Sequence, residues 1–329
     1  MLTSGTFPNQ LKNARVIPIY KGGLKEDLSN WRPVSLVSKI SKVFEKLLLS
    51  RFNSFIEKHN LIGDKQYGFK RNTGANEAIR DLTSTLYNNL DARKKCLLIL
   101  LDLSNAFSSL PHSLLLNKMK KMGFRGVALS LVEDYLKDRP QTVKFNGVES
   151  PPILITDFSS PQGTVCSPTL FNLFINDILH LSLNGYVSVY ADDTALLCWG
   201  DSMAELYARA KEDFYKIQLW LSKNGLTINK KKTVYLDFNK RGQGQFCIPE
   251  ITRVNHAKYL RVILDEKLKW DDHCNMVTTK LRKTIYKFIL LRQVVDRDTI
   301  KMIYFALVQP HLTYGILAWG GSGQVTSSK

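Results

Sequence analysis

The sequence predicts an α+β fold, in which buried strands and amphipathic helices follow one another along the chain. Three observations carry this prediction. Residues 95–103 form a continuous aliphatic run, which is typical of a strand buried on both faces of a sheet. Residues 186–199 form two strand-like runs around an acidic turn, as in a β-hairpin. Residues 167–179 repeat apolar side chains at the helical period, with Ser167 as the expected N-cap and Pro168 in the first turn.

The remaining elements are predicted from the spacing of apolar residues, which differs between helices and strands. We expect further helices over residues 41–55, 75–90, 203–223 and 276–291, and two helices within residues 113–139. We expect further strands over residues 15–20, 226–238 and 259–264. The last helix should turn Leu281, Ile285 and Phe288 inward. Its outer lysines form a basic stripe, which by itself also fits an ordinary solvated face.

Composition favours a nucleic-acid partner. The chain has 329 residues, of which 44% are hydrophobic, so it can bury a core and is not a disordered tail. Lys and Arg number 46 against 29 Asp and Glu, which gives a net charge of +17. Residues 1–95 carry 17 basic and 8 acidic residues and residues 276–329 carry 8 and 2, whereas the middle nearly balances. This pattern indicates that the two ends of the chain bind a polyanion. Nucleic acid is the preferred interpretation, and an anionic membrane surface is the alternative.

Several classes of protein are disfavoured by what the sequence lacks. The five cysteines are scattered and form no pair or His/Cys set at zinc-site spacing, which favours a reducing compartment. The first ten residues contain no signal-peptide core. The longest apolar run, residues 96–101, is far too short to span a bilayer. We therefore expect a soluble, intracellular protein that uses no membrane.

Three carboxylates are the candidate catalytic residues. Asp102 ends the buried strand, and Asp192 and Asp193 occupy the hairpin turn 90 residues later. They can converge only if the two strands are neighbours in one sheet. Three such carboxylates suit two Mg²⁺ ions, which together can clamp the attacking and leaving oxygens of a phosphoryl transfer. Taken alone, the acidic pair also fits two solvated turn residues.

A series of motifs surrounds these acids in a fixed order. They are residues 14–21 (ARVIPIYK), 30–36 (NWRPVSL), 66–70 (QYGFK), 102–107 (DLSNAF), 160–172 (SPQGTVCSPTLFN), 190–193 (YADD), 225–233 (GLTINKKKT) and 258–260 (KYL). Together they resemble the fingers and palm motifs of reverse transcriptases. Residues 31–35 and 171–177 are similar to the non-LTR (LINE-type) retrotransposon polymerases of the jockey-like group. The resemblance runs from about residue 14 to residue 320.

The resemblance implies a right-hand polymerase. Fingers would span residues 1–95, a palm with a ferredoxin-like antiparallel sheet and inserted fingers-side helices residues 96–275, and a truncated helical thumb residues 276–329. The implied activity is that of an RNA-directed DNA polymerase, which adds deoxynucleotides to a primer 3′-hydroxyl for retrotransposon copying. The implied partners are an RNA template, a DNA primer and deoxynucleoside triphosphates. We expect cytoplasmic synthesis and work in the nucleus at a nicked target, with the endonuclease domain of full elements missing from this chain.

The resemblance also implies the metal ligands and the leaving-group acid. Asp102, Asp192 and Asp193 would hold two Mg²⁺ ions, with Mn²⁺ as a possible substitute. Lys232 would protonate the pyrophosphate leaving group, although Lys230 and Lys231 beside it leave the choice of lysine open.

Substrate contacts are implied for a further set of residues. The expected triphosphate and nucleotide contacts are Lys21, Arg32, Phe107, Gln162, Gly163 and Tyr190, and the expected primer grip is Lys258, Tyr259 and Leu260 within a hairpin. The Phe107 ring would reject a ribose 2′-hydroxyl by steric clash. Lys21 also fits an ordinary surface lysine, and Phe107 an ordinary core residue.

Three positions depart from the family pattern, and three rival interpretations follow. Ser108 stands where an acid is usual, Ser160 where Val is usual, and Arg261 where Gly is usual, which bears on the primer-grip turn. The rivals are a non-catalytic nucleic-acid-binding relic, a metal nuclease, and an inactive fragment or decayed copy. Loss of one of the three acids would favour the first rival, the non-catalytic relic. The Pro-Gln-Gly segment and Phe107 count against the second, because a nuclease has no use for them.

Overall fold

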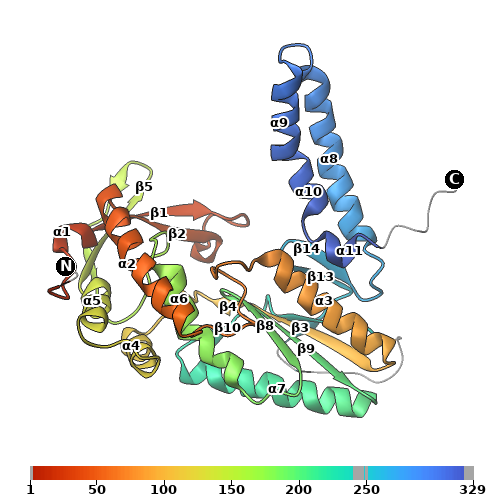
Figure 1. Cartoon of the computed structure of the whole chain (residues 1–329), viewed down its shortest axis with the longest axis horizontal. Helices are drawn as coiled ribbons and strands as arrows, with labels where there is room; N and C mark the ends of the chain where they lie inside the picture. The colour runs from red at the N-terminus through yellow and green to blue at the C-terminus, as the bar shows by residue number, and fades with distance from the viewer. Residues whose placement is uncertain (1–2, 240–247, 249–250, 322–329) are drawn as a thin grey trace. The chain divides into compact units, whose positions relative to one another are not determined.

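The computed structural model describes residues 3–239, 248 and 251–321 (Figure 1). The backbone divides into two compact units. The first comprises Met1–Phe69, Leu103–Ser182 and Lys216–Ile228, and the second Lys70–Asp102, Leu183–Tyr215 and Asn229–Lys329. The expected boundaries of fingers, palm and thumb stay a prediction. Each unit is described here by itself.

A five-stranded sheet forms the core of the second unit. Its strand order is β12-β11-β3-β9-β8, and all neighbours are antiparallel except β11 and β12. The strands are β3 (Lys95–Leu101), β8 (Tyr186–Tyr190), β9 (Asp193–Gly200), β11 (Val234–Asp237) and β12 (Thr252–Arg253). Every residue of β3 after Lys95 is buried, so the aliphatic run is the central strand that the sequence predicted. The predicted hairpin is β8–β9, and β3 lies directly beside it.

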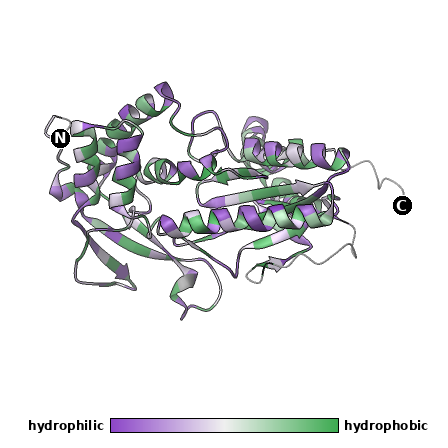
Figure 2. Ribbon diagram, turned by 90° about the horizontal axis from the view of Figure 1, so that it is seen from below, coloured by the Kyte–Doolittle hydropathy of each residue, from purple (hydrophilic) through white to green (hydrophobic). Residues whose placement is uncertain are grey.

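Two helices lie on opposite sides of this sheet (Figures 1 and 2). They are α3 (Ala75–Asp91) and the start of α7 (Met203–Lys223). On α3 the buried residues Ile79, Leu82 and Leu86 join one apolar cluster with Leu98 and Leu197 of the sheet. Burial of each such side chain contributes about 1.5–3 kcal/mol. This packing keeps the ends of β3 and β9 in a fixed relation.

A hairpin and four helices complete the second unit. They are β13 (His256–Tyr259), β14 (Val262–Asp265), α8 (Asp271–Leu291), α9 (Arg297–Leu307), α10 (Gln309–Thr313) and α11 (Ile316–Trp319). Helix α8 begins five residues before the predicted start. The Asp265 carboxylate accepts from the backbone N–H groups of Lys267, Lys269 and Trp270, which fixes the approach to the helix.

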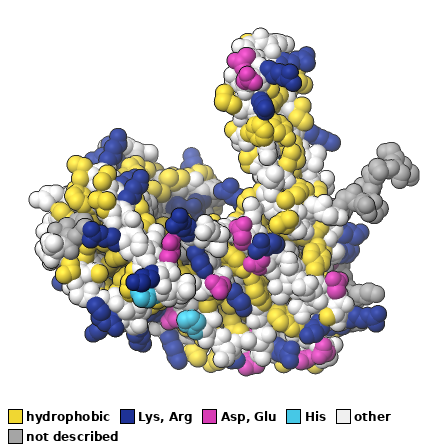
Figure 3. All heavy atoms as spheres, in the orientation of Figure 1, with side chains coloured by type: hydrophobic (Ala, Val, Ile, Leu, Met, Phe, Trp, Pro, Cys, Tyr) yellow, Lys and Arg dark blue, Asp and Glu magenta, His cyan; other side chains and the backbone are white. Residues whose placement is uncertain are grey.

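The α8–α9 pair buries less than its sequence suggested. No residue of α9 is buried, and in α8 only His273 and Val277 are. The inward position predicted for Ile285 is wrong, since its side chain is 55% exposed. Figure 3 shows hydrophobic side chains on the visible surface of this pair. The helical period identified the apolar stripe, but a two-helix projection offers few neighbours to cover it.

The first unit combines a mixed sheet with several helices. The sheet contains β1 (Ala14–Tyr20), β2 (Trp31–Leu36), β5 (Arg139–Phe145), β6 (Val148–Glu149) and β7 (Ile153–Ile155), and a separate short pair joins β4 (Leu103–Ser104) to β10 (Thr227–Ile228). The helices are α1 (Asn9–Lys12), η1 (Leu28–Asn30), α2 (Lys39–Lys58), α4 (His112–Lys121), α5 (Gly126–Leu136), α6 (Ser167–Ile175) and η2 (Asn176–His180). Helices α4 and α5 confirm the predicted break near Gly123 and Gly126, whereas β5–β7 were not predicted.

Helix α6 is buried along almost its whole length, as its apolar pattern predicted. The prediction that Ser167 caps it is wrong, because Cys166 occupies the N-cap position without a side-chain cap. The Ser167 hydroxyl instead donates to the carbonyl of Pro161 at 2.8 Å. Across the described residues, no helix is both long enough and apolar enough to cross a membrane.

Candidate active site

The acidic turn between β8 and β9 is a tight two-residue connection. Tyr190 and Asp193 pair across the ladder, so Ala191 and Asp192 alone make the turn. Ala191 is buried and has a φ of +55°. This left-handed conformation costs a residue with a Cβ roughly 1–2 kcal/mol. The strain is offset by the ladder on either side, and it sets Asp192 at the tip and Asp193 at the start of β9.

The end of β3 brings Asp102 to the same place. Leu101, the last residue of β3, pairs with Thr194 of β9, so Asp102 follows beside Asp193. The Asp102 backbone N–H donates to the Thr233 hydroxyl at 3.2 Å, and its carbonyl accepts from Asn229 N–H at 2.8 Å. These bonds fasten the strand end to the segment that carries Lys232. The convergence expected from neighbouring strands is therefore present.

The Asp193 carboxylate is influenced by the other two acids. Burial among surrounding protein atoms and, to a smaller extent, the negative charges of Asp192 and Asp102 together raise the pKa of Asp193 from 3.8 to about 6. The rise occurs although the Asp193 side chain is exposed on its outer side. Like charges that raise a carboxyl pKa in this way favour a cation between them.

This charge and the hard oxygen donors fit divalent cations. Among the described residues, however, no three His, Cys, Asp or Glu side chains are already gathered as a metal cage. The argument for a divalent cation therefore rests on the carboxylate oxygens as donors and on the repulsion that Asp193 experiences from Asp192 and Asp102. It does not rest on a closed coordination shell.

A cavity of about 300 Å³ joins several of the predicted site residues. It is lined by Asp102, Asp193, Lys232 and the three residues from Lys258 to Leu260, together with apolar side chains and His256. Residues predicted separately as metal ligands, leaving-group acid and primer grip thus face one hollow. Asp192 and Tyr190 do not line it, although both lie on the adjoining hairpin.

The predicted primer-grip hairpin forms despite the absence of glycine in its turn. Tyr259 pairs with Val262, and the two residues between them, Leu260 and Arg261, have φ values of +44° and +68°. Such a turn favours Gly or Asn, and Arg261 adopts it at a cost in strain. The departure from the family pattern therefore does not prevent the turn.

Contacts from distant residues hold this hairpin, and sequence patterns gave no signal for them. The Tyr259 and Ser188 hydroxyls lie 3.0 Å apart, which joins the hairpin to β8. The Tyr314 hydroxyl donates to the Leu260 carbonyl at 2.7 Å. Burial raises the pKa of Tyr259, so its hydroxyl stays neutral. His256, also missed, lies at the cavity and 3.8 Å from the Asp272 carboxylate.

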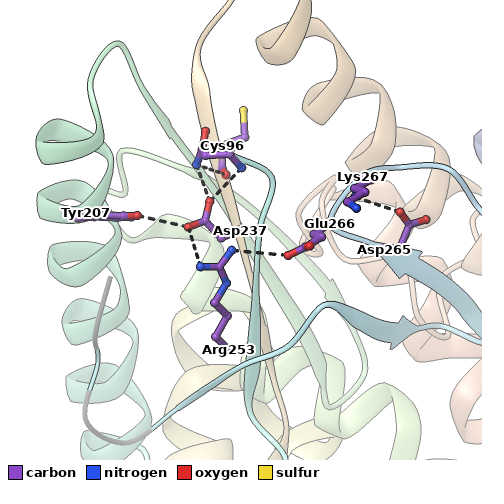
Figure 4. Close-up of polar contacts among 8 residues, drawn as sticks. Cys96, Tyr207, Asp237, Arg253, Asp265, Glu266 and Lys267 are labelled. Atoms are coloured by element: carbon purple, nitrogen blue, oxygen red, sulfur yellow. Dashed lines mark hydrogen bonds and ion pairs between the residues drawn. The ribbon is translucent and has the colours of Figure 1, made fainter. Parts of the chain in front are cut away.

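An arginine bridge supports the other end of the hairpin (Figure 4). Arg253 lies between two carboxylates, 3.9 Å from Asp237 and 3.5 Å from Glu266, which follows β14. Tyr207 of α7 donates to Asp237 at 3.3 Å. Burial and the Asp237 charge raise the pKa of Tyr207 to about 12. The bridge connects β11, β12 and the end of β14.

The first unit contains the residues predicted to contact the nucleotide, except Tyr190, which belongs to the second unit. Gly163 has a φ of +102°, and a Cβ there would lie 2.9 Å from the Ser35 carbonyl oxygen. Ser35 N–H donates to the Gln162 carbonyl at 2.7 Å, so the loop lies directly against β2. Phe107 is half-buried, and its ring stacks on Phe171 with centroids 4.6 Å apart. One face of the Phe107 ring is therefore taken by the core.

The two predicted triphosphate contacts lie at the connected ends of β1 and β2. Lys21 follows β1, and its N–H donates to the Asn30 carbonyl; Arg32 pairs with Ile19 in the ladder. Both side chains are exposed. Figure 3 shows many Lys and Arg side chains on the visible face of this unit. The roles of both cations stay predictions.

Comparisons with known proteins agree with this arrangement. The profile of the family described as "Reverse transcriptase (RNA-dependent DNA polymerase)" matches residues 21–264. The chain is 28% identical to the "Probable RNA-directed DNA polymerase from transposon BS" of Drosophila melanogaster, over 95% of this chain and 36% of that protein. It is 27% identical to the "RNA-directed DNA polymerase from mobile element jockey" of the same organism, over 97% and 36%. The chain thus spans about a third of the length of these curated relatives.

Solved structures of telomerase share the fold. Apo telomerase from Candida tropicalis, truncated from its C-terminal domain, superposes with a TM-score of 0.54 at 13% identity, covering 79% of this chain and 54% of that one. Telomerase from Candida albicans, solved with a fragment of telomeric RNA, gives a TM-score of 0.52 at 11% identity, covering 96% and 61%.

Proposed function

Because the chain belongs to the reverse transcriptase (RNA-dependent DNA polymerase) family, we propose that it extends a DNA primer with deoxynucleotides on an RNA template. The observation that carries the proposal is the convergence of Asp102, Asp193 and Lys232 on one cavity, with Asp192 near enough to shift the pKa of Asp193. In the proposed reaction the primer 3′-hydroxyl oxygen bonds to the α-phosphorus of the nucleotide. The hydroxyl proton passes to solvent, the bond from that phosphorus to the bridging oxygen breaks, and pyrophosphate leaves.

The chain's own groups supply position and charge. The carboxylates of Asp102, Asp192 and Asp193 would hold two Mg²⁺ ions, or Mn²⁺, which when bound supply Lewis-acid activation and neutralise the phosphates. Lys232 lines the cavity with the two acids, so its ammonium can donate a proton to the departing pyrophosphate. Tyr259 and Leu260, fixed by Ser188 and Tyr314, would hold the primer end.

The same proposal assigns most of the nucleotide contacts to residues of the first unit. Gln162 and Gly163 offer backbone and amide groups, and the exposed cations Lys21 and Arg32 suit phosphate oxygens. Phe107 would exclude the 2′-hydroxyl, and Tyr190 would contact the substrate from the hairpin. In a cell we expect this reaction in the nucleus, at a nicked chromosomal target.

Primer extension by the purified chain tests the proposal. The reaction would contain a primed RNA template, deoxynucleotides and Mg²⁺ or Mn²⁺. The double variant Asp192→Asn/Asp193→Asn should lose at least about 100-fold in extension rate, since groups that stabilise transition-state charge contribute on that scale. The matched control is Asp201→Asn, an exposed aspartate that follows β9 at its far end.

The outcomes separate the proposal from its rivals. Extension by the parent chain and the Asp201 variant, but not by the double variant, supports the polymerase. A folded chain that binds primer–template yet extends nothing with either metal is the binding relic. A primer that is shortened rather than lengthened identifies a nuclease. Either of the last two results overturns the proposal.

A further inference from the structure

A fully buried carboxylate on α2 contacts the loop that precedes α6. Glu45 has 0% of its surface exposed, and a glutamate is almost never buried to this degree unless its charge is satisfied. One carboxylate oxygen accepts from the Val165 backbone N–H at 2.6 Å. The other accepts from the Ser41 hydroxyl at 3.2 Å, within the same helix. The shorter bond is the one that reaches the loop.

This loop is held from two sides. Its Gln162 carbonyl accepts from Ser35 of β2, and three residues later its Val165 N–H donates to Glu45 of α2. Gly163 lies between these two points, with its positive φ and with no room for a Cβ against Ser35. The backbone of Gln162 and Gly163 is therefore set by one bond to a strand and one bond to a buried charge.

A buried cation accompanies the carboxylate. Arg139 is 1% exposed and donates to the Tyr135 carbonyl at 2.9 Å, while its Nε and Nη2 find no hydrogen-bond partner among the described residues. Burial raises the pKa of the Cys166 thiol, with Glu45 adding to the rise and Arg139 opposing it. Both side chains therefore act on the same interior site, the surroundings of the Cys166 thiol.

We propose that Glu45 is a positioning residue for the incoming nucleotide. Its carboxylate holds the Val165 amide and thereby sets the Gln162–Gly163 backbone at which the nucleotide is to be bound. A hydrogen bond to a charged acceptor is roughly twice as strong as one between neutral groups. This inference rests on the proposed function, because it takes Gln162 and Gly163 as nucleotide contacts.

The test is the substitution Glu45→Gln, which keeps the shape of the side chain but removes its carboxylate. The KM for deoxynucleotides should rise about 3- to 10-fold with less than about a twofold change in kcat, the expected effect of weakening one charge-assisted bond. Amide hydrogen exchange at Val165, measured by NMR or mass spectrometry, should accelerate about tenfold or more by the same reasoning.

Two controls isolate positioning from general loss of stability. Glu57→Gln makes the same change at an exposed glutamate of α2 and should alter neither quantity. Leu131→Ala removes a buried side chain of α5 and should lower the melting temperature without raising the nucleotide KM. Should Glu45→Gln fail to fold, Ser41→Ala removes one donor to the carboxylate and should give a KM rise of about two- to threefold.

Unchanged KM and unchanged exchange at Val165 in the folded Glu45 variant would overturn the inference. The inference would also be overturned if Glu45→Gln and Leu131→Ala lose the same amount of stability and Glu45→Gln raises the KM no more than Leu131→Ala does. If the parent chain extends no primer, the proposed function fails; the exchange measurement then still decides whether Glu45 holds the loop.

Discussion

Replacing Asp193 with asparagine removes a carboxylate whose pKa is raised to about 6 by crowding and by the charges of Asp192 and Asp102. Between its ordinary value of 3.8 and about 6, the folded chain holds a proton that the unfolded chain has released. The free energy of unfolding of the parent chain therefore falls as pH rises through that window. Asparagine does not ionise, so Asp193→Asn should be more stable than the parent above about pH 6 and equally stable below about pH 4.

The size of the gain follows from the same pKa. A rise from 3.8 to about 6 corresponds to a ceiling of about 3 kcal/mol, at 1.36 kcal/mol for each tenfold change. The Asp193 side chain is exposed on its outer side, so solvent screening reduces this to about 1 kcal/mol. In a chain of this size that free energy raises the melting temperature by about 2 °C.

Thermal unfolding in EDTA at pH 4 and pH 8 measures this difference, with Asp201→Asn as the control for a lost surface charge. Added Mg²⁺ should then stabilise the parent and not the variant, because a ligand stabilises only the state that binds it. A variant that is less stable than the parent at pH 8 in EDTA refutes the reasoning. So does a stability difference that stays constant between pH 4 and pH 8.

Three further predictions concern single residues. Phe107→Val should raise the use of ribonucleotides relative to deoxynucleotides about 10- to 100-fold in primer extension. If this ratio stays unchanged while the melting temperature falls, the ring has only a structural role, its stacking on Phe171. Gly163→Ala places a methyl 2.9 Å from a carbonyl of β2 at a φ of +102° and should cost about 1–3 kcal/mol in urea unfolding. Gly147→Ala, where the φ is +84° but space is open, is its control and should cost less. Arg261→Gly should gain up to about 1 kcal/mol at a φ of +68°, and a loss of stability would show that the arginine side chain contributes more than its backbone strain costs.

The part of the site that the sequence could predict is the part fixed by strand pairing. The aliphatic run before Asp102 marks a central strand, and the run around Asp192 and Asp193 marks a hairpin. Once β3 and β9 pair as antiparallel neighbours, these two ends lie together. The family membership and the right-hand polymerase fold, inferred from motifs, are confirmed. The individual roles of the site residues stay predictions.

The contacts that sequence reasoning missed join residues far apart in the chain. Ser188 meets Tyr259, and Tyr314 meets Leu260 54 residues away. The buried Glu45 reaches Val165 across 120 residues. Each depends on which face a side chain takes after the whole unit has packed, and no local period encodes that. The periodicity of α8 failed for Ile285 for a related reason, since a period reports an apolar face and not the neighbour that would cover it.

The strained turns at the cavity show how such distant contacts compensate for local sequence. Ala191, Leu260 and Arg261 all take left-handed conformations that glycine would adopt without cost. Locally, residues with a Cβ disfavour both turns. The ladders that flank each turn, and the bonds from Ser188 and Tyr314, over-determine the backbone and offset the strain. A non-glycine residue at position 261 therefore lowers the stability of the hairpin but does not prevent the hairpin from forming.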